Sequence, residues 1–411
     1  MLQRSNHKDC VIGLDVGTTK VCAIIGEQES DGTLNILGVG STPSRGLKKG
    51  IVVDIDETVD SIQKAVHKAS RMAGREVRDV IVGIAGGHIQ CHNVRASVEI
   101  INPERGVSRS DIIRVNERAR ALSMPVDREI LHSIPQEYVT DGGPVKNPLG
   151  QVSSMLEVNV HVVTAAVTLV KNLVRCVRQA EYNTRDILLE SIASAQAILT
   201  EEEKELGVLL LDIGGGTTDI AIFGAGHIRY SGVVPYGGDN VTGDIAQGLK
   251  VSHHDAENLK KKYGCAMASL VRPEETLTVS QAVNKKKVTV SRHKMSDIIE
   301  ARLEEIFHLA GERIKATAFR EKFYGGVVLT GGSALIEGSC ELAEKVFDCP
   351  ARVGMAEGLK GMTSVVSSPI YSTGVGLVEH GFSDALNRPP DGKGIYEWVK
   401  NILSRIVEYF K

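Results

Sequence analysis

The chain has 411 residues, a formal net charge of −3, and 42% hydrophobic and 24% charged residues. That length is enough for two domains with full cores. The nearly balanced charge excludes a pervasive basic field, so nucleic acid is not expected as a partner. The seven cysteines form no C-x-x-C pair, which argues against a zinc site or a disulfide framework and favours a reducing cytosol. No stretch approaches the roughly 18 apolar residues of a spanning helix, so a soluble or peripheral protein is expected.

The first residues predict a run of short strands. Glycine-bounded, β-branched segments lie at 11–17, 21–27 and 34–40. Apolar residues at helical spacing predict a helix from about Asp54 to Ala73, with Gly74 as its C-terminal stop. A buried strand is expected next, over 79–87.

Residues 88–162 are interpreted as an insertion into this first unit. A strand is predicted at about 93–101, followed by a helix that opens at Ser108 or Ser110, and further strands extend to Val163.

The strand–turn–strand pattern of the first residues recurs in the second half of the chain. VLLLDIGGGTTDIAIF (208–223) repeats the strand–turn–strand pattern of the first residues, and each copy has an aspartate before a Gly/Thr turn. A duplicated domain is therefore expected. Other predicted elements are helices at 168–182, about 191–200, 238–263, about 296–320 and about 335–347, strands at 186–191 and 325–335, a β-rich piece at about 276–292, and a Pro/Gly-rich linker at 383–394.

The two turns have the residue types that a phosphate chain requires. LDVGTTK (14–20) and LLDIGGGTTDI (210–220) both end a strand with aspartate and continue with small residues. Backbone N–H groups can cradle phosphates only where side chains leave room, which favours Gly and Thr. Mg²⁺ keeps its waters and is held through carboxylates and phosphates, so Asp15 and Asp212 are expected to hold it through water. Two such turns facing each other would clamp a triphosphate between domains.

A third Gly-rich turn, LTGGSAL (329–335), follows a predicted strand, and its flat backbone suits an adenine or ribose. Either phosphate turn alone would also fit an ordinary tight hairpin. The three turns in this order favour a nucleotide site.

Together with IYSTGVGL (370–377), these turns resemble the signature set of the actin, heat-shock-70 and sugar-kinase superfamily over nearly the whole chain. Within it, the chain is most similar to the FtsA family of bacterial cell-division proteins, because SRGLKKGIVVDID (44–56) runs straight into the first helix and the extra segment falls at 88–162. The resemblance implies an α/β, actin-like (ribonuclease-H-like) two-domain fold around an ATP cleft. Its implied parts are a first α/β domain (1–87 and 163–200), an inserted subdomain (88–162), a second α/β domain (201–235 and 321–382), its smaller subdomain (236–320), the linker (383–394) and a terminal helix (395–411).

The resemblance also implies roles for individual residues. Asp15, Asp212 and Gln196 are the catalytic candidates, and Gln196 would orient the attacking water. A helix-surface amide explains Gln196 equally well, so ATP binding is expected with weak or no ATPase activity. The expected nucleotide contacts are Gly17, Thr18, Thr19 and Lys20 on one side of the phosphates, Gly215, Gly216, Thr217 and Thr218 on the other, Gly238 at the ribose-phosphate, Glu257 and Lys260 beside the nucleoside (or on a solvated helix face), and Gly331, Gly332 and Ser333 behind the adenosine.

The implied partners are those of a division protein. FtsA proteins bind the C-terminal peptide of the tubulin-like protein FtsZ, here at roughly 236–310, where Arg302 matches a position that the family uses and would hold an acidic peptide. Self-association into filaments, with 88–162 in the contact, and binding to other division proteins are also implied. The expected location is the cytoplasmic face of the cell membrane at the division septum.

The last 17 or so residues predict an amphipathic helix that binds membrane lipid. A Pro/Gly-rich linker precedes it, and it contains the only tryptophan, a residue that favours membrane interfaces. The alternative is a helix docked on the protein's own core. The apolar stripe consists of Ile395, Trp398, Val399, Ile402, Leu403, Ile406, Val407 and Phe410.

Other members of the actin superfamily are the alternative function. A small-molecule kinase would need a general base at the γ-phosphate and has no reason to end in a membrane helix. An MreB-like protein also binds membranes but has its insertion elsewhere, and a pilus-assembly protein remains open.

Overall fold

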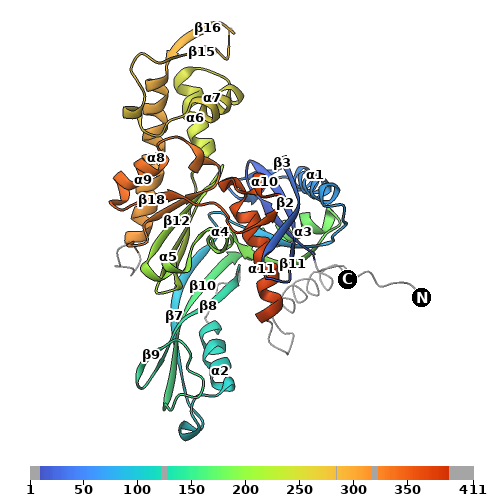
Figure 1. Ribbon diagram of the computed structural model, residues 1–411, viewed down its shortest axis with the longest axis vertical. Coiled ribbons are helices and arrows are strands. Elements are labelled where there is room, and N and C mark those ends of the chain that lie inside the picture. The colour runs from blue at the N-terminus through green and yellow to red at the C-terminus, as the bar shows by residue number, and fades with distance from the viewer. Residues whose placement is uncertain (1–9, 122–126, 284, 317–322, 388–411) are drawn as a thin grey trace, which may run out of the picture.

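Two mixed β-sheets form the middle of the molecule (Figure 1). The structure is a computed structural model that describes residues 10–121, 127–283, 285–316 and 323–387. The first sheet contains β1 (Cys10–Val16), β2 (Lys20–Gln28), β3 (Leu34–Pro43), β6 (Asp79–Ile84), β11 (Asn183–Leu189) and β19 (Lys360–Gly361), and the second contains β12 (Val208–Ile213), β13 (Thr218–Gly224), β14 (His227–Val234), β17 (Val327–Thr330) and β18 (Ala351–Val353).

The two sheets have the same topology. The order β3-β2-β1-β6-β11 in the first corresponds to β14-β13-β12-β17-β18 in the second. In each, three antiparallel strands are joined to two parallel ones. The predicted duplication and the predicted α/β, actin-like fold are thus confirmed.

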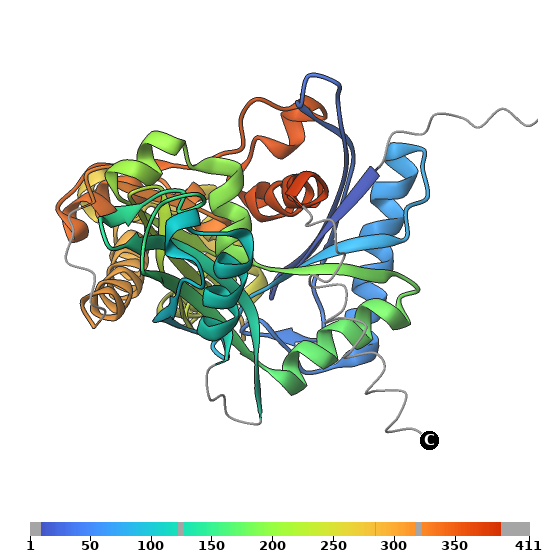
Figure 2. The same cartoon turned by 90° about the horizontal axis from the view of Figure 1, so that it is seen from below.

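Helices cover both faces of the first sheet (Figure 2). On one face lie α1 (Ile55–Ala73) and α3 (Val167–Gln179), and on the other lie α4 (Glu190–Ile198) and α11 (Ser372–Asn387). As predicted, α1 ends at Gly74, which has a φ of 64°, and Asp54 caps its start by accepting a hydrogen bond from the N–H of Glu57. A Cβ on Gly40 would lie 1.9 Å from the carbonyl oxygen of Ala65, so this glycine allows α1 to pack closely on β3.

The insertion forms a four-stranded antiparallel sheet that shares a separate core with the helix α2 (Arg109–Arg120). Of the two candidate start residues, Ser108 caps the helix, in a capping box with Asp111. In Figure 1 the insertion projects from the opposite end of the molecule to α6, α7 and the β15–β16 hairpin. Its elements are β7 (Gln90–Glu99), α2 (Arg109–Arg120), β8 (Arg128–Thr140), β9 (Gly143–Val145) and β10 (Met155–Ala166).

At that opposite end, the long helix α8 connects the hairpin to the second sheet. The aromatic rings of Phe307 on α8 and Phe347 on α9 have centroids 5.9 Å apart, and both helices share the core of the second sheet. The elements of this half are α5 (Glu201–Leu206), α6 (Gly238–Leu249), α7 (His253–Tyr263), β15 (Thr276–Ser280), β16 (Lys287–Ser291), α8 (Arg292–Lys315) and α9 (Ser339–Phe347).

The end of the described chain differs from the predicted boundaries. Residues 321–382 were expected in the second α/β domain, but β19 pairs with β3 of the first sheet and α11 packs against β1 and β2. The reason is burial: Val375, Leu377 and Val378 complete the apolar core on that face of the first sheet. In addition, α11 continues to Asn387, so residues 383–387, expected in the linker, are helical.

The predicted terminal helix (395–411) lies outside the described residues. Among the residues that are described, none of the helices combines the length and the apolar character needed to cross a membrane.

Candidate nucleotide site

The β1–β2 turn and the β12–β13 turn meet at the centre of the molecule. Both turns are closed in the same way, by a hydrogen bond of 3.0 Å from Gly17 N–H to the Lys20 carbonyl and from Gly214 N–H to the Thr217 carbonyl. A Cβ on Gly215 would lie 2.3 Å from Cγ2 of Thr19. The structure therefore brings the two predicted phosphate turns face to face, and only glycine fits at this contact.

Four acidic side chains lie directly behind these turns: Asp15, Asp212 and Asp219, which are buried, and Glu190, which is half-buried. Burial raises the pKa of Asp15 to about 6, with a smaller upward contribution from Asp212. Burial, followed by the charges of Asp15 and Asp219, holds the pKa of Glu190 well above its usual range. By itself this cluster therefore binds protons more tightly than carboxyls in water do.

Added positive charge would relieve this cluster. Asp212 accepts hydrogen bonds from Ser194 Oγ (2.7 Å) and Thr373 Oγ1 (3.1 Å), but Oδ1 of Asp219 is buried without a hydrogen-bond partner. The positive charge of Lys20 lowers the pKa of Asp15, although the Nζ of Lys20 donates its hydrogen bond to the carbonyl of Ile370 (2.5 Å). A hydrated Mg²⁺ fits these acids. Within the described part of the chain, no three His, Cys, Asp or Glu side chains are grouped as direct metal ligands.

The residues predicted beside the nucleoside are also brought together. Lys260 is only 8% exposed, which rules out the solvated helix face, and its Nζ donates to the Gly238 carbonyl (2.9 Å) and to Thr242 Oγ1 (2.8 Å). Burial alone would raise the pKa of Glu257, but hydrogen bonds from Lys260 and Thr242 outweigh it and lower the pKa to about 2. This ion pair therefore fixes the start of α6.

The third turn lies against the second. Gly331 has a φ of 81°, and a Cβ there would lie 2.5 Å from Oδ1 of Asp212, so glycine is required. A Cβ on Gly238 would lie 2.5 Å from Oγ of Ser333. The predicted adenosine turn, which also contains Gly332, thus lies against both Asp212 and the start of α6.

Gln196 does not lie at this site. Its Nε2 donates to Ser383 Oγ (3.2 Å), on the α11 side of α4. Ser194, which bonds Asp212, is two residues away, and side chains two apart on a helix point in nearly opposite directions. The prediction that Gln196 orients water in the cleft is therefore wrong, because its helix presents Ser194 there instead.

Glu190 and Asp219 were missed by the sequence analysis. Glu190 follows the buried strand β11 directly, and Asp219 lies opposite Asp212 in the β12–β13 register. Both match the criterion that selected Asp15, an acid at the inner end of a buried strand, so the same signal would have found them.

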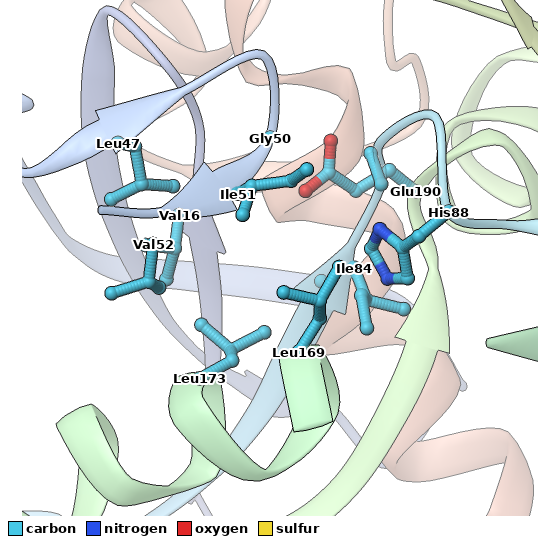
Figure 3. Close-up of a pocket in the computed structure, with 12 residues that line it drawn as sticks. Val16, Leu47, Gly50, Ile51, Val52, Ile84, His88, Leu169, Leu173 and Glu190 are labelled. Atoms are coloured by element: carbon cyan, nitrogen blue, oxygen red, sulfur yellow. The ribbon is translucent and has the colours of Figure 1, made fainter. Parts of the chain in front are cut away.

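A small cavity of about 10 Å³, roughly the least space that can hold one water, is lined in part by Glu190 (Figure 3). Figure 3 shows Glu190 and His88 lining it together with apolar side chains. Both ring nitrogens of His88 are buried without a partner, and burial lowers the pKa of His88 to about 4. Glu190 thus lies between the acidic cluster and a neutral imidazole.

Arg302, the predicted peptide contact, lies outside the cleft on α8. Its guanidinium donates to both carboxylate oxygens of Asp244, at 2.5 and 3.2 Å, and also pairs with Glu305. Its Cζ lies 5.9 Å from the ring centroid of Tyr236. An acidic peptide at Arg302 would therefore compete with Asp244.

Comparison with solved structures shows the fold. The chain superposes on the PilM–PilN type IV pilus biogenesis complex with a TM-score of 0.64 at 16% identity, covering 90% of this chain and 98% of that one. MreB5 of Spiroplasma citri bound to ADP gives a TM-score of 0.54 at 16% identity, covering 92% and 99%. These likenesses establish an actin-like architecture, and identities this low carry no more than that.

Sequence comparison identifies the family. The family model for cell division protein FtsA matches residues 209–376, and that for the SHS2 domain inserted in FtsA matches residues 86–164. Cell division protein FtsA of Pseudomonas aeruginosa is 45% identical over 383 residues (93% of this chain and 90% of that protein). FtsA of Escherichia coli K12 is 34% identical over 420 residues, covering 99% of this chain and 100% of that protein. The chain therefore belongs to the FtsA family of cell-division proteins.

Proposed function

We propose that this protein binds ATP with Mg²⁺ in the cleft, polymerises on the cytoplasmic face of the membrane, tethers FtsZ filaments there and helps to assemble the septal division machinery. The observation that carries the proposal is the meeting of two glycine turns over three buried acids and the half-buried Glu190. Backbone N–H groups that side chains do not cover can bind phosphates, and buried acids next to them favour a cation. MreB5 of Spiroplasma citri, which has the same fold, has been solved with ADP and with AMPPNP.

In this proposal each part of the site has its own task. Thr18, Thr19 and the glycines of the second turn bind the phosphates, and Lys20 adds a positive charge. Asp15 and Asp212 hold the hydrated cation, which neutralises phosphate charge when bound. Gly238 and the adenosine turn position the nucleoside.

Glu190 replaces Gln196 as the residue that would orient or accept a proton from water. The carboxyl of Glu190 can accept a proton only in its ionised form, which a nearby cation would favour. We propose ATP binding with weak or no ATPase activity.

The proposed membrane anchor is the apolar stripe of 395–411. Burying large apolar side chains contributes ~1.5–3 kcal/mol each when fully inserted, and a short helix of this kind becomes ordered on lipid rather than in water. The helix α11, which comes before the tail in the chain, is packed on the first sheet through its own apolar residues. The tail can therefore bind lipid without unfolding this core.

Liposome co-sedimentation tests the anchor. Deletion of 395–411 should leave a folded, ATP-binding protein that stays in the supernatant and no longer brings FtsZ filaments to the pellet. Trp398→Glu or Phe410→Glu should reduce pelleting strongly, because a charge must lose its hydration to insert, while Ser404→Ala on the polar face should pellet normally. A truncated protein with a much lower melting temperature would show instead that the tail is part of the core.

Filament formation is proposed through a head-to-tail contact that does not close, in which the insertion (88–162) takes part. The insertion projects from one end of the molecule, where it is free to meet a second copy (Figure 1). Electron microscopy on a lipid monolayer with ATP should show filaments, and monomers alone at high surface density would argue against them.

A further inference from the structure

Tyr236 lies between two cations that come from different parts of the chain. Nζ of Lys49 is 5.2 Å from its ring centroid, and Cζ of Arg302 is 5.9 Å from it. Both distances are within the range of cation–π attraction. Lys49 is in the turn between β4 (Leu47–Lys48) and β5 (Ile51–Val52), whereas Tyr236 lies two residues before the start of α6. The contact between Lys49 and Tyr236 therefore joins the two sides of the cleft.

Each side of this contact is hydrogen-bonded to a phosphate turn or to the strand that leaves it. The N–H of Gly50 donates to Oγ1 of Thr18 (3.0 Å), and Oγ1 of Thr218 donates to the carbonyl of Tyr236 (2.9 Å). Movement of one turn away from the other must therefore change the distance between Lys49 and the tyrosine ring.

The turn that carries Lys49 has a strained backbone. Lys49 and Gly50 have φ values of 51° and 74°, as in a two-residue turn with both central residues left-handed. Asn, Asp or Gly would occupy the position of Lys49 with less strain, so a lysine there indicates a role for its side chain.

The ring is held in place from the other side. Arg302 is fixed by its two hydrogen bonds to Asp244, so it stays beside Tyr236. The position of the Tyr236 ring beside Lys49 is thereby fixed.

We propose that Lys49 and Tyr236 form a latch that keeps the cleft closed, and that nucleotide enters and leaves only when this contact opens. The turns already touch through Thr19 and Gly215, so a triphosphate cannot pass until they separate. This inference rests on the proposed ATP binding, and it adds a control of nucleotide exchange.

The test is the release of a fluorescent ATP analogue from the full-length protein, chased with excess ATP in the presence of Mg²⁺. Lys49→Ala and Tyr236→Leu should each speed release roughly two- to fivefold, the rate equivalent of about 0.5–1 kcal/mol for an exposed cation–π pair. The double variant should release no faster than the single variants, because both remove one contact. The controls are Lys48→Ala, which changes the exposed neighbour, and Tyr236→Phe, which keeps the ring; both should release at the wild-type rate.

Hydrogen exchange in the nucleotide-free protein gives a second readout. Amides of residues 47–52 should exchange faster in Lys49→Ala than in wild type or Lys48→Ala. Wild-type release rates and exchange in Lys49→Ala and Tyr236→Leu, or equal acceleration by Lys48→Ala, would overturn the latch. If wild type binds no analogue, the proposed ATP site fails, and hydrogen exchange alone then decides the latch.

Discussion

Thr19 and Gly215 are in contact across the cleft: Cγ2 of Thr19 lies where a side chain on residue 215 would begin. Thr18 has the same relationship to Gly216, with Oγ1 2.7 Å from the position of a Cβ. Because β1 and β12 occupy the same place in two sheets of identical topology, the two hairpins meet turn to turn. The contact thus explains why the second turn is richer in glycine than the first.

Gly215→Val should abolish or strongly weaken ATP binding. The added side chain would overlap Thr19 and force the turns apart, so we expect affinity to fall roughly tenfold or more, about 1.4 kcal/mol. Gly142→Val is the matched control, because the nearest atom to its Cβ, at 3.9 Å, is a side-chain oxygen of the insertion. Calorimetric titration with Mg²⁺ and ATP measures both, and unchanged affinity in Gly215→Val would refute the phosphate turn.

Glu190→Gln should remove hydrolysis, whereas Gln196→Ala should leave it unchanged. Glu190 lies among other acids that raise its pKa, so an uncharged amide should preserve ATP binding, remove residual hydrolysis and raise the melting temperature of the nucleotide-free protein. Gln196 faces Ser383, so its replacement should leave hydrolysis and binding unchanged. Single-turnover phosphate release on both variants decides between them; loss of hydrolysis in Gln196→Ala alone would restore the original assignment.

The sequence predicted the elements that repeat or are buried, and it was wrong where the chain crosses between sheets. The two Asp–Gly–Thr turns were recognisable because phosphate cradles require small residues at fixed places after a strand. The return of α11 to the first sheet could not be read from order along the chain, because its apolar residues would suit either core.

The rotation of α4 about its axis explains why the assignment of Gln196 was wrong. Gln196 was selected by residue type, yet only the direction of α4 decides which of its residues face the cleft, and that direction depends on packing against α11. Similarly, the sequence alone fits two positions for Glu257 and Lys260, a solvated helix face or the nucleoside site. The hydrogen bond from Lys260 to the Gly238 carbonyl, which only the fold brings together, decides for the second.

Stability should depend on pH through Glu379 on α11. Burial raises the pKa of Glu379 to about 7, from 4.5, with a smaller opposing effect of Lys204. Because the folded state binds this proton more tightly, the contribution is fully present below the unfolded pKa and is lost as pH rises through the folded pKa, by up to ~3 kcal/mol.

Glu379→Gln should therefore gain stability over wild type as pH is raised from about 5 to about 8. Thermal unfolding of the two proteins across this range measures the difference, with Glu202→Gln on exposed α5 as the control. A constant difference between Glu379→Gln and wild type across the range would contradict the raised pKa.

The last prediction concerns the peptide surface. If an acidic FtsZ peptide binds at Arg302, it must replace Asp244 as partner of the guanidinium. Arg302→Gln should then weaken capture of the peptide roughly tenfold or more, since hydrogen bonds to charged groups contribute about 1.5–3 kcal/mol. Asp244→Asn removes the competing charge and should strengthen capture, a gain that a purely structural ion pair would not give.

Arg272→Gln is the matched control on the same half of the molecule, because its side chain is 75% exposed and pairs at the surface with Glu274 and Glu275. Fluorescence anisotropy of a labelled peptide measures capture, and calorimetry with ATP checks that the cleft is intact in each variant. Capture that survives Arg302→Gln and is unaffected by Asp244→Asn would place the peptide on another surface of the protein.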